Sequence, residues 1–332
     1  MRALIVDHTL GTGLRVGEVE SPRPGPSQAL VKVGAFSLNY GDVVAARELP
    51  DGAIPGWEAA GRVVEAARDG SGPRVGTPVI TLDEANGWAE YRAADTAMIG
   101  VVPQDADLGG MSTIPVAANS ALRALRRIGP ILGRTVMVTG ATGGVGRYAV
   151  QLARMGGATV IAVTSSPRQY ADELRSLGAT QVVSRPSEHA GLVYGVVECV
   201  GGALLVEAFD LLERDGVLVA LGHVAPEPES FPPGALISSP TRHNRSIVTF
   251  HQLDGTPLSP DLSWLSEQVT LGALTPSVAW RGSWHRIDEA VDRLLNRTLH
   301  GKAVVEICHP EADGSARPPS AAGAGRSHPR CS

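Results

Sequence analysis

The spacing of the hydrophobic positions changes near residue 111 of the chain. Before this point the sequence has short β-prone runs separated by segments rich in proline and glycine, at 3–6, 29–35, 61–65 and 79–82. This pattern predicts short strands joined by tight turns. After this point, apolar residues at helical spacing alternate with strand-like apolar runs, which indicates βαβ units and a parallel sheet.

The predicted elements of the second part follow one another at regular intervals. We expect helices over 117–128, 146–155, 169–177 and 204–212, and strands over 135–139, 159–163, 195–200, 217–221 and 247–251. After residue 260 the pattern predicts a helix, a β-prone patch at 277–281, a helix over 288–295 and a strand over 303–307. Residues 309–332 are mostly proline, glycine, serine and alanine without periodicity, so we expect this tail to be disordered.

Composition and charge exclude several classes of protein. The chain is 43% apolar and 19% charged with a net charge of −5, so no basic surface for nucleic acid is expected. No apolar run approaches the roughly 18 residues of a membrane span, and Asp7 and His8 interrupt any signal-peptide core. The cysteines, Cys199, Cys308 and Cys331, have the spacing of neither a disulfide framework nor a thiolate metal site. A cytoplasmic protein is expected.

The strongest local signal is a strand that runs into a glycine-rich turn and a helix, over 135–146. Gly143 allows a pyrophosphate to approach the backbone, and Gly146 allows the helix to pack closely on the strand. The first glycine of the usual fingerprint is Ala141, so the motif is a variant. A glycine-rich turn without a ligand is the alternative, but the strand–turn–helix context favours a dinucleotide. The predicted contacts in this turn are Ala141, Thr142, Gly143, Gly144, Val145 and Gly146.

The end of the next predicted strand indicates which dinucleotide is bound. A unit that binds NAD usually offers an acidic residue to the ribose about 20 residues after the glycines. Here there is no acid before Asp172, and hydroxyl groups and a guanidinium stand in its place. Such side chains suit the 2′-phosphate of NADPH, and we expect contacts from Thr164, Ser165, Ser166 and Arg168. The alternative for Arg168 is a solvated residue at a helix start.

Five motifs together resemble those of one superfamily: 37–42 (SLNYGD), 55–61 (PGWEAAG), 140–146 (GATGGVG), 200–202 (VGG) and 301–305 (GKAVV). The chain is similar over residues 1–307 to the medium-chain dehydrogenase/reductase superfamily, in its zinc-free quinone oxidoreductase and enoyl reductase branch. No tyrosine is followed four residues later by lysine, which sets the chain apart from short-chain dehydrogenases.

The resemblance implies an α/β fold of two domains with the active cleft between them. A GroES-like β-barrel domain would comprise 1–115 and 253–308, and a Rossmann domain with a doubly wound parallel sheet would comprise 116–252. Members of the superfamily commonly form homodimers by pairing the last Rossmann strand, here residues 245–251, and we expect the same arrangement.

The resemblance also allows a test for zinc. The three ligand positions of the superfamily's zinc enzymes fall on Asn39, on Trp57, and on or next to Val116. An indole and an aliphatic side chain cannot ligate Zn²⁺, and an amide is a poor ligand. The four cysteines of the structural zinc lobe, expected near 83–100, are also absent. We therefore predict that the protein binds no metal.

Without a metal, reduction of a conjugated C=C bond is easier than oxidation of a simple alcohol, because a few hydrogen-bond donors can stabilise the enolate. The resemblance places Asn39 and Tyr40 at substrate and nicotinamide contacts, with Tyr40 as the candidate proton donor and Asn39 as a polar anchor. Asp42 matches an acid that orients this loop. Trp57 would form an apolar wall, and Ser120 would face the nicotinamide. The alternatives are a core role for Tyr40 and simple packing for Trp57.

Other candidates lie at the carboxyl ends of the predicted sheet strands, where ligands bind in open α/β folds. His223 and His251 are candidate substrate contacts, with surface histidines as the alternative reading. Val200, Gly222 and Lys302 are candidate cofactor contacts, although an exposed lysine beside a strand would be ordinary. Cys199 lies in the buried strand expected over 195–200, and we expect it to be inert.

The leading hypothesis is an NADPH-dependent, zinc-independent reductase of α,β-unsaturated carbonyl compounds (enones or enoyl thioesters) or quinones. The first alternative is an NADPH-binding sensor or structural protein with little turnover. The second is an alcohol dehydrogenase or ketone reductase of the same superfamily.

Overall fold

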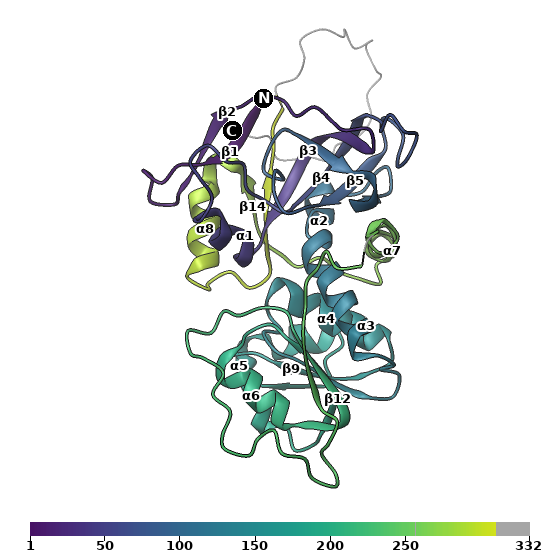
Figure 1. The fold of residues 1–332 in the computed structure, drawn as a ribbon, viewed down its shortest axis with the longest axis vertical. Coiled ribbons are helices and arrows are strands. Elements are labelled where there is room, and N and C mark those ends of the chain that lie inside the picture. Colours follow the sequence, from purple (N-terminus) through teal and green to yellow (C-terminus); the bar gives the residue numbers. More distant parts are fainter. Residues whose placement is uncertain (256, 310–332) are drawn as a thin grey trace, which may run out of the picture.

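The computed structural model describes residues 1–255 and 257–309, which form two lobes (Figure 1). The upper lobe contains both the first and the last described residues, and the middle of the chain forms the lower lobe. The strands are β1 (Arg2–Val6), β2 (Leu14–Glu18), β3 (Gln28–Leu38), β4 (Glu58–Glu65), β5 (Pro78–Leu82), β6 (Tyr91–Asp95), β7 (Ile99–Val101), β8 (Thr135–Val138), β9 (Thr159–Val163), β10 (Gln181–Val183), β11 (Val193–Glu198), β12 (Leu212–Ala220), β13 (Ser246–Thr249), β14 (Val278–Ser283) and β15 (Lys302–Glu306). The helices are α1 (Tyr40–Ala46), α2 (Leu108–Met111), α3 (Asn119–Ile128), α4 (Gly144–Met155), α5 (Pro167–Ser176), α6 (Gly202–Asp210), α7 (Ser259–Thr270) and α8 (Ile287–Leu295).

The upper lobe is built on a mostly antiparallel sheet that the C-terminal part of the chain completes, with β14 parallel to β15. Its strand order is β14-β15-β3-β4-β5-β7, and β6 also pairs with β3. The register of β15 on β3 sets Ala303 opposite Leu38. Because neighbouring residues in a register stay close, Lys302 is brought next to Asn39, although the two are far apart in sequence.

The lower lobe contains a six-stranded parallel sheet with the order β10-β9-β8-β11-β12-β13. The chain starts this sheet at β8, builds outward through β9 and β10, and then returns to build the other half from β11. The direction of growth therefore reverses between β8 and β11. Ligands of open α/β sheets bind at the carboxyl ends of the strands at such a switch point.

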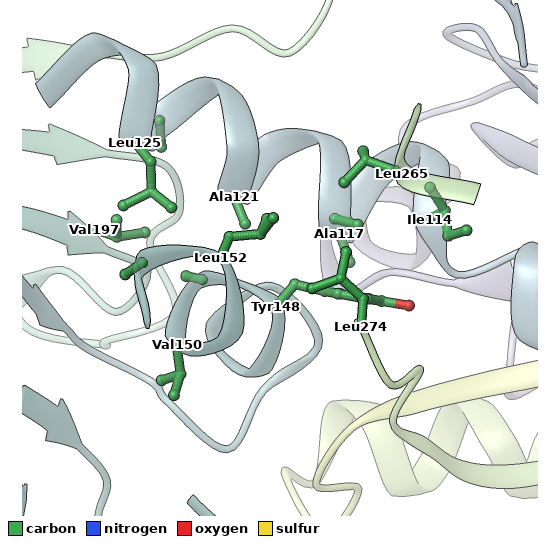
Figure 2. Packing of buried hydrophobic residues seen from close by; sticks show 14 of the residues in the cluster. Ile114, Ala117, Ala121, Leu125, Tyr148, Val150, Leu152, Val197, Leu265 and Leu274 are labelled. Carbon is green, nitrogen blue, oxygen red and sulfur yellow. The ribbon is translucent and has the colours of Figure 1, made fainter. Parts of the chain in front are cut away.

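A continuous apolar core holds the two lobes together. A π-helix over Ile114–Ala118 leads directly into α3, and Figure 2 shows Ile114 and Ala117 packed with Tyr148 of α4 and Leu265 of α7. All four are almost fully buried, and burying a large apolar side chain contributes about 1.5–3 kcal/mol. The same core therefore fixes the position of α4, which carries the glycine-rich turn, against the upper lobe.

The predicted fold class is confirmed: a mostly antiparallel GroES-like sheet stands beside a doubly wound parallel sheet. The exact domain boundaries stay predictions. The sequence patterns missed β2, α1, β6, β7, α2 and β10, which are mostly short. Of the tail predicted to be disordered, only His309 is described, and its ring is hydrogen-bonded to the Val33 carbonyl at 2.6 Å. The rest, 310–332, lies outside the described residues. In the described ranges, no helix has the length and apolar character that a membrane crossing requires.

Candidate active site between the two lobes

The glycine-rich turn after β8 leaves the N-terminus of α4 open. Gly143 is the N-cap residue, and the first turn of α4 has no acidic residue. The Arg147 amide makes an early helical bond to the Gly143 carbonyl at 3.1 Å, so the preceding amides have no partner within the helix. A Cβ on Gly146 would lie 2.3 Å from the Gly140 oxygen, which explains the glycine. The turn fits a diphosphate, because free amides and the helix dipole both stabilise an anion.

The predicted 2′-phosphate residues gather beside this turn, at the end of β9. The Thr142 and Thr164 hydroxyl oxygens are 3.4 Å apart, and the Ser166 amide donates to the Thr164 hydroxyl at 3.4 Å. Arg168 is exposed on the first turn of α5. That turn has no acidic residue. The end of β9 therefore presents hydroxyl groups and one cation.

Glu58, at the start of β4, is the centre of a buried polar network that the sequence patterns did not single out. Its side chain is fully buried. One carboxylate oxygen accepts from Lys302 Nζ and from Asn39 Nδ2, each at 2.8 Å, and from the Ser37 hydroxyl. The other oxygen accepts from the Val116 amide at 2.7 Å, in the first turn of the π-helix. The buried charge is thus both paired and hydrogen-bonded, as burial of a carboxylate requires.

Asn39 is held in a fixed orientation by this network. Its Oδ1 accepts from Lys302 Nζ, while its Nδ2 donates to Glu58 and, at 3.2 Å, to Asp42. Both amide hydrogens are therefore used inside the network, since an amide NH₂ has only two. Asn39 therefore has no amide hydrogen left to donate to a ligand.

Asp42 is a second buried carboxyl in the same network. It accepts from the Asn39 amide at 2.8 Å, which closes the N-terminus of α1. The pKa of Asp42 is raised to about 7, chiefly by burial; the nearby Lys302 ammonium opposes the rise, and the Glu58 carboxylate adds to it. Two buried carboxyl groups thus share one ammonium group, and the protonated form of Asp42 relieves the excess negative charge.

Lys302 joins the polar network to the glycine-rich turn. A Cβ on Gly144, the first residue of α4, would lie 2.6 Å from Lys302 Cδ. The stem of Lys302 therefore lies against the backbone at the N-terminus of α4 in the lower lobe, while its ammonium group pairs with Glu58 in its own lobe. Lys302 is only 3% exposed, so the expectation of an ordinary surface lysine is wrong. Its predicted position beside the cofactor turn agrees with this contact.

Tyr40 and Trp57 lie next to the network. Tyr40 is the half-buried first residue of α1. A Cβ on Gly41 would lie 2.7 Å from the Trp57 ring, so the indole covers the first turn of α1. The Trp57 carbonyl accepts from Arg92 Nη1 at 2.9 Å, and Arg92 is itself buried. Ser120, in the first turn of α3, is 5% exposed.

The three positions expected to correspond to zinc ligands converge here, because Glu58 touches Asn39 and the Val116 amide and directly follows Trp57. An amide, an indole and an aliphatic side chain do not fit Zn²⁺, which prefers thiolate and imidazole ligands. Throughout the described ranges, no cluster of three or more His, Cys, Asp or Glu residues is arranged to hold a metal ion.

On the β11 side of the switch point, the last residue of β11, Glu198, is a third buried carboxylate. It accepts from the Thr139 hydroxyl at 2.8 Å and from the Val200 amide at 2.9 Å, and so ties the loop after β8 to the loop after β11. The Val200 carbonyl in turn accepts from the Val224 and Ala225 amides. These bonds hold Val200 in the loop after β11, and Gly222 lies in the loop after the neighbouring strand β12.

The two histidines proposed as substrate contacts have different surroundings. His223 Nε2 lies 3.0 Å from a Glu229 carboxylate oxygen, and its ring lies over Gly201 at the switch point. His251 is exposed in a turn closed by a bond from the Asp254 amide to the His251 carbonyl. Burial raises the pKa of the Cys199 thiol, so the thiolate is scarce at neutral pH, as expected of an inert cysteine.

Two buried charged residues that the sequence patterns did not single out, Glu58 and Arg92, could have been found from their neighbours in sequence. Glu58 stands directly before the small residues of 59–61, which lead into the strand expected over 61–65, and a charge at the edge of such a segment requires partners when it is buried. Arg92 is a similar case within 89–94. The identity of their partners could not be read, because these come from elements far away in sequence.

Comparisons with known proteins agree with this architecture. Residues 25–125 match the family model described as the alcohol dehydrogenase GroES-like domain, and residues 144–267 match the one described as zinc-binding dehydrogenase. The quinone oxidoreductase-like protein 2 of Bos taurus is 30% identical over 87% of this chain and 88% of its own. The chloroplastic quinone-oxidoreductase QR1 of Triphysaria versicolor is 28% identical over 92% of this chain and 98% of its own.

An acryloyl-coenzyme A reductase of Sulfurisphaera tokodaii is 27% identical, and the match covers 92% of this chain and 100% of that protein. Among solved structures, the quinone oxidoreductase of Coxiella burnetii has the same fold, with a TM-score of 0.78 at 24% identity over 93% of this chain and 99% of that one. The likeness of sequence and fold extends through both lobes. The chain therefore belongs to the medium-chain dehydrogenase/reductase superfamily of oxidoreductases.

Proposed function

We propose that the protein is an NADPH-dependent, zinc-independent reductase that transfers hydride to an α,β-unsaturated carbonyl compound or a quinone. The observation that carries this proposal is the chemistry of the groups between the lobes. A helix N-terminus suited to a diphosphate lies against Lys302, and the positions that would ligate zinc hold Asn39, Trp57 and Val116. Relatives named as quinone oxidoreductases and as acryloyl-coenzyme A reductases support this class of substrate.

The preference for NADPH is supported by the end of β9. A carboxylate at that position would repel a 2′-phosphate by on the order of 4 kcal/mol at 4 Å and an effective dielectric constant of 20. The chain instead has Thr164, Ser165, Ser166 and Arg168 there. A mycobacterial protein solved in complex with NADPH shares the fold, with a TM-score of 0.79 at 22% identity.

The bound nicotinamide would supply the hydride. In the proposed reaction the chain's own residues hold the cofactor and manage the charge on the substrate. The α4 amides bind the diphosphate, while Ser120, Val200, Gly222 and Lys302 line the nicotinamide side. Hydride addition to the β-carbon leaves negative charge on the carbonyl oxygen, and a preorganised donor at such an oxygen contributes on the order of 10²–10³ in rate.

Tyr40 is the proposed donor to that oxygen or to the α-carbon. Both Asn39 hydrogens are used within the network, so Asn39 acts by holding Lys302 and the start of α1 in place. Trp57 forms the apolar wall against a flat conjugated substrate. His223 and His251 remain candidate substrate contacts.

Steady-state assays with NADPH and NADH test this proposal, using enones, enoyl thioesters, quinones, ketones and alcohols as substrates. Saturable oxidation of NADPH by one of the first three classes is the expected result. Binding of NADPH with no turnover of any compound would instead indicate a sensor or structural protein. Turnover of ketones or alcohols alone, with stoichiometric zinc in the purified protein, would indicate the alcohol dehydrogenase alternative.

We also propose that the protein is a homodimer joined at β13, as in its superfamily. β13 is the last strand of the six-stranded sheet, and Ile247 on it is 40% exposed. A strand edge with free amides and carbonyls can pair with a second copy. Light scattering of the purified protein tests the dimer, and Val248→Pro in β13 should convert it to monomers.

A further inference from the structure

The turn between α8 and β15 reaches from the upper lobe onto the lower one. It comprises residues 296–300 and is called the strap below. Figure 1 shows it on the side of the upper lobe that faces α5. Its base is anchored in the upper lobe, because the Thr298 and Leu299 amides both donate to the Arg293 carbonyl of α8, and Leu299 packs against the core of that lobe.

One end of the strap contacts the loop after β12. The Arg297 guanidinium donates to the Val224 carbonyl. Val224 in turn donates its amide to the Val200 carbonyl at 2.9 Å, so this contact continues into the loop after β11. Arg297 has a positive φ of 57°, a conformation uncommon for a long side chain and one that the surroundings must hold.

The other end of the strap contacts α5. The His300 and Tyr170 rings lie with their centroids 4.7 Å apart at an angle of 41°. The Arg147 guanidinium carbon lies 5.9 Å from the Tyr170 ring centroid, and this buried guanidinium pairs with Glu173 of α5. Arg147 Nε also donates to the Thr142 carbonyl at 2.9 Å, so the aromatic contact is tied to the glycine-rich turn.

The order of strands shows what lies between these two contacts. Tyr170 belongs to the helix that follows β9, and Val224 belongs to the loop that follows β12. In the sheet, β8 and β11 stand between those strands, and the gap between β8 and β11 is the switch point. Directly after the strap, Lys302 lies against Gly144 in the turn after β8. The strap therefore crosses the carboxyl edge of the sheet where the dinucleotide is expected to bind.

We propose that the strap closes over the bound dinucleotide and that the coenzyme enters and leaves only when the Arg297 and His300 contacts are broken. Arg297 and His300 are then positioning residues that set the rate of coenzyme exchange. Each contact joins exposed or half-buried groups, so both can break without unfolding either lobe. The inference rests on the proposed binding of NADPH, and it is independent of which substrate is reduced.

The rate of NADPH dissociation tests the strap directly. Full-length protein loaded with NADPH is mixed with excess NADP⁺, and the loss of nicotinamide fluorescence is followed by stopped flow. His300→Ala is expected to raise the dissociation rate by about 2- to 10-fold, the factor that an aromatic pair is worth. His300→Phe keeps a ring on Tyr170 and should restore a rate close to that of the unchanged protein.

Arg297→Asn removes the guanidinium but keeps a residue that tolerates positive φ, and it should also accelerate dissociation. The association rate should rise in the same variants, so the dissociation constant changes less than either rate. Arg293→Gln is the matched control, because Arg293 pairs with Glu289 within α8 and should leave both rates unchanged. As a second readout, NADPH should slow amide hydrogen exchange in 296–300.

Unchanged NADPH dissociation rates in His300→Ala and Arg297→Asn would overturn the proposed role of the strap. Equal acceleration of dissociation by Arg293→Gln would overturn it as well. If the unchanged protein binds no dinucleotide, the proposed function fails together with the strap. If it binds NADPH but reduces none of the compounds, only the proposed reaction fails, since the exchange rates are measured without substrate.

Discussion

Lys302 Nζ lies 2.8 Å from Oε1 of Glu58, and the two side chains are 3% and 0% exposed. This ion pair joins the last strand of the described chain to the first strand after α1. It also stands between the glycine-rich turn and the residues proposed to contact substrate. Several properties of the protein should depend on it.

Removing one member of this pair should destabilise the fold strongly. Lys302→Met leaves the Glu58 carboxylate buried without its cation, and breaking a buried pair in this way costs about 3–5 kcal/mol. The double variant Lys302→Met/Glu58→Gln should lose less than the sum of the single variants, since neither charge is left alone. Urea unfolding of the four proteins gives the coupling free energy. Additive losses would mean that the two side chains do not stabilise each other.

Stability should fall as the pH rises toward neutrality because of Asp42. Burial raises its pKa from 3.8 to about 7, so the folded state holds a proton that the unfolded state has already lost. Stability therefore decreases with pH between these two values, by roughly 4 kcal/mol at most, and the contribution levels off above them. Asp42→Asn should flatten this part of the profile. A profile unchanged by Asp42→Asn would assign the slope to another group.

Arg168 should distinguish the two coenzymes. If it binds the 2′-phosphate, Arg168→Ala should weaken NADPH by about 1.5–3 kcal/mol, the range for a charge-assisted hydrogen bond, and leave NADH nearly unchanged. Fluorescence titration with each coenzyme measures this. Arg175→Ala, which removes another exposed arginine of α5 paired with Asp172, is the control and should change neither affinity. Equal weakening of both coenzymes would exclude Arg168 from a phosphate site.

Tyr40→Phe should lower kcat by roughly 10²- to 10³-fold if the hydroxyl donates to the developing negative charge. The dissociation constant of NADPH should hardly change, since the ring remains. Measuring kcat under saturating substrate together with a coenzyme titration separates the two effects. A normal kcat in Tyr40→Phe would assign proton donation to another residue.

Local patterns predicted the regular elements of the lower lobe closely. The strand expected over 159–163 is β9 with the same bounds, and the helix expected over 146–155 is the body of α4. These elements are long or strongly apolar, so their own periodicity defines them. In contrast α1 was missed, because a helix of 7 residues carries too few apolar positions for a periodic signal. One signal of α1 was present in the sequence: Asp42 lies three residues after Asn39, which is the spacing of a helix capping box.

The sequence by itself determined the superfamily, the two kinds of sheet and the dinucleotide turn, because each depends on motifs or periodic patterns within short contiguous segments. Only the tertiary structure decided that Glu58 lies at the centre of a buried network, that Asn39 uses both of its hydrogens there, and that Lys302 is buried rather than exposed. These facts arise where β15 pairs with β3 and α4 packs against the upper lobe. A charge becomes tolerable in the interior only when distant segments bring it partners, and a local pattern of hydrophobic and polar residues contains no record of those partners.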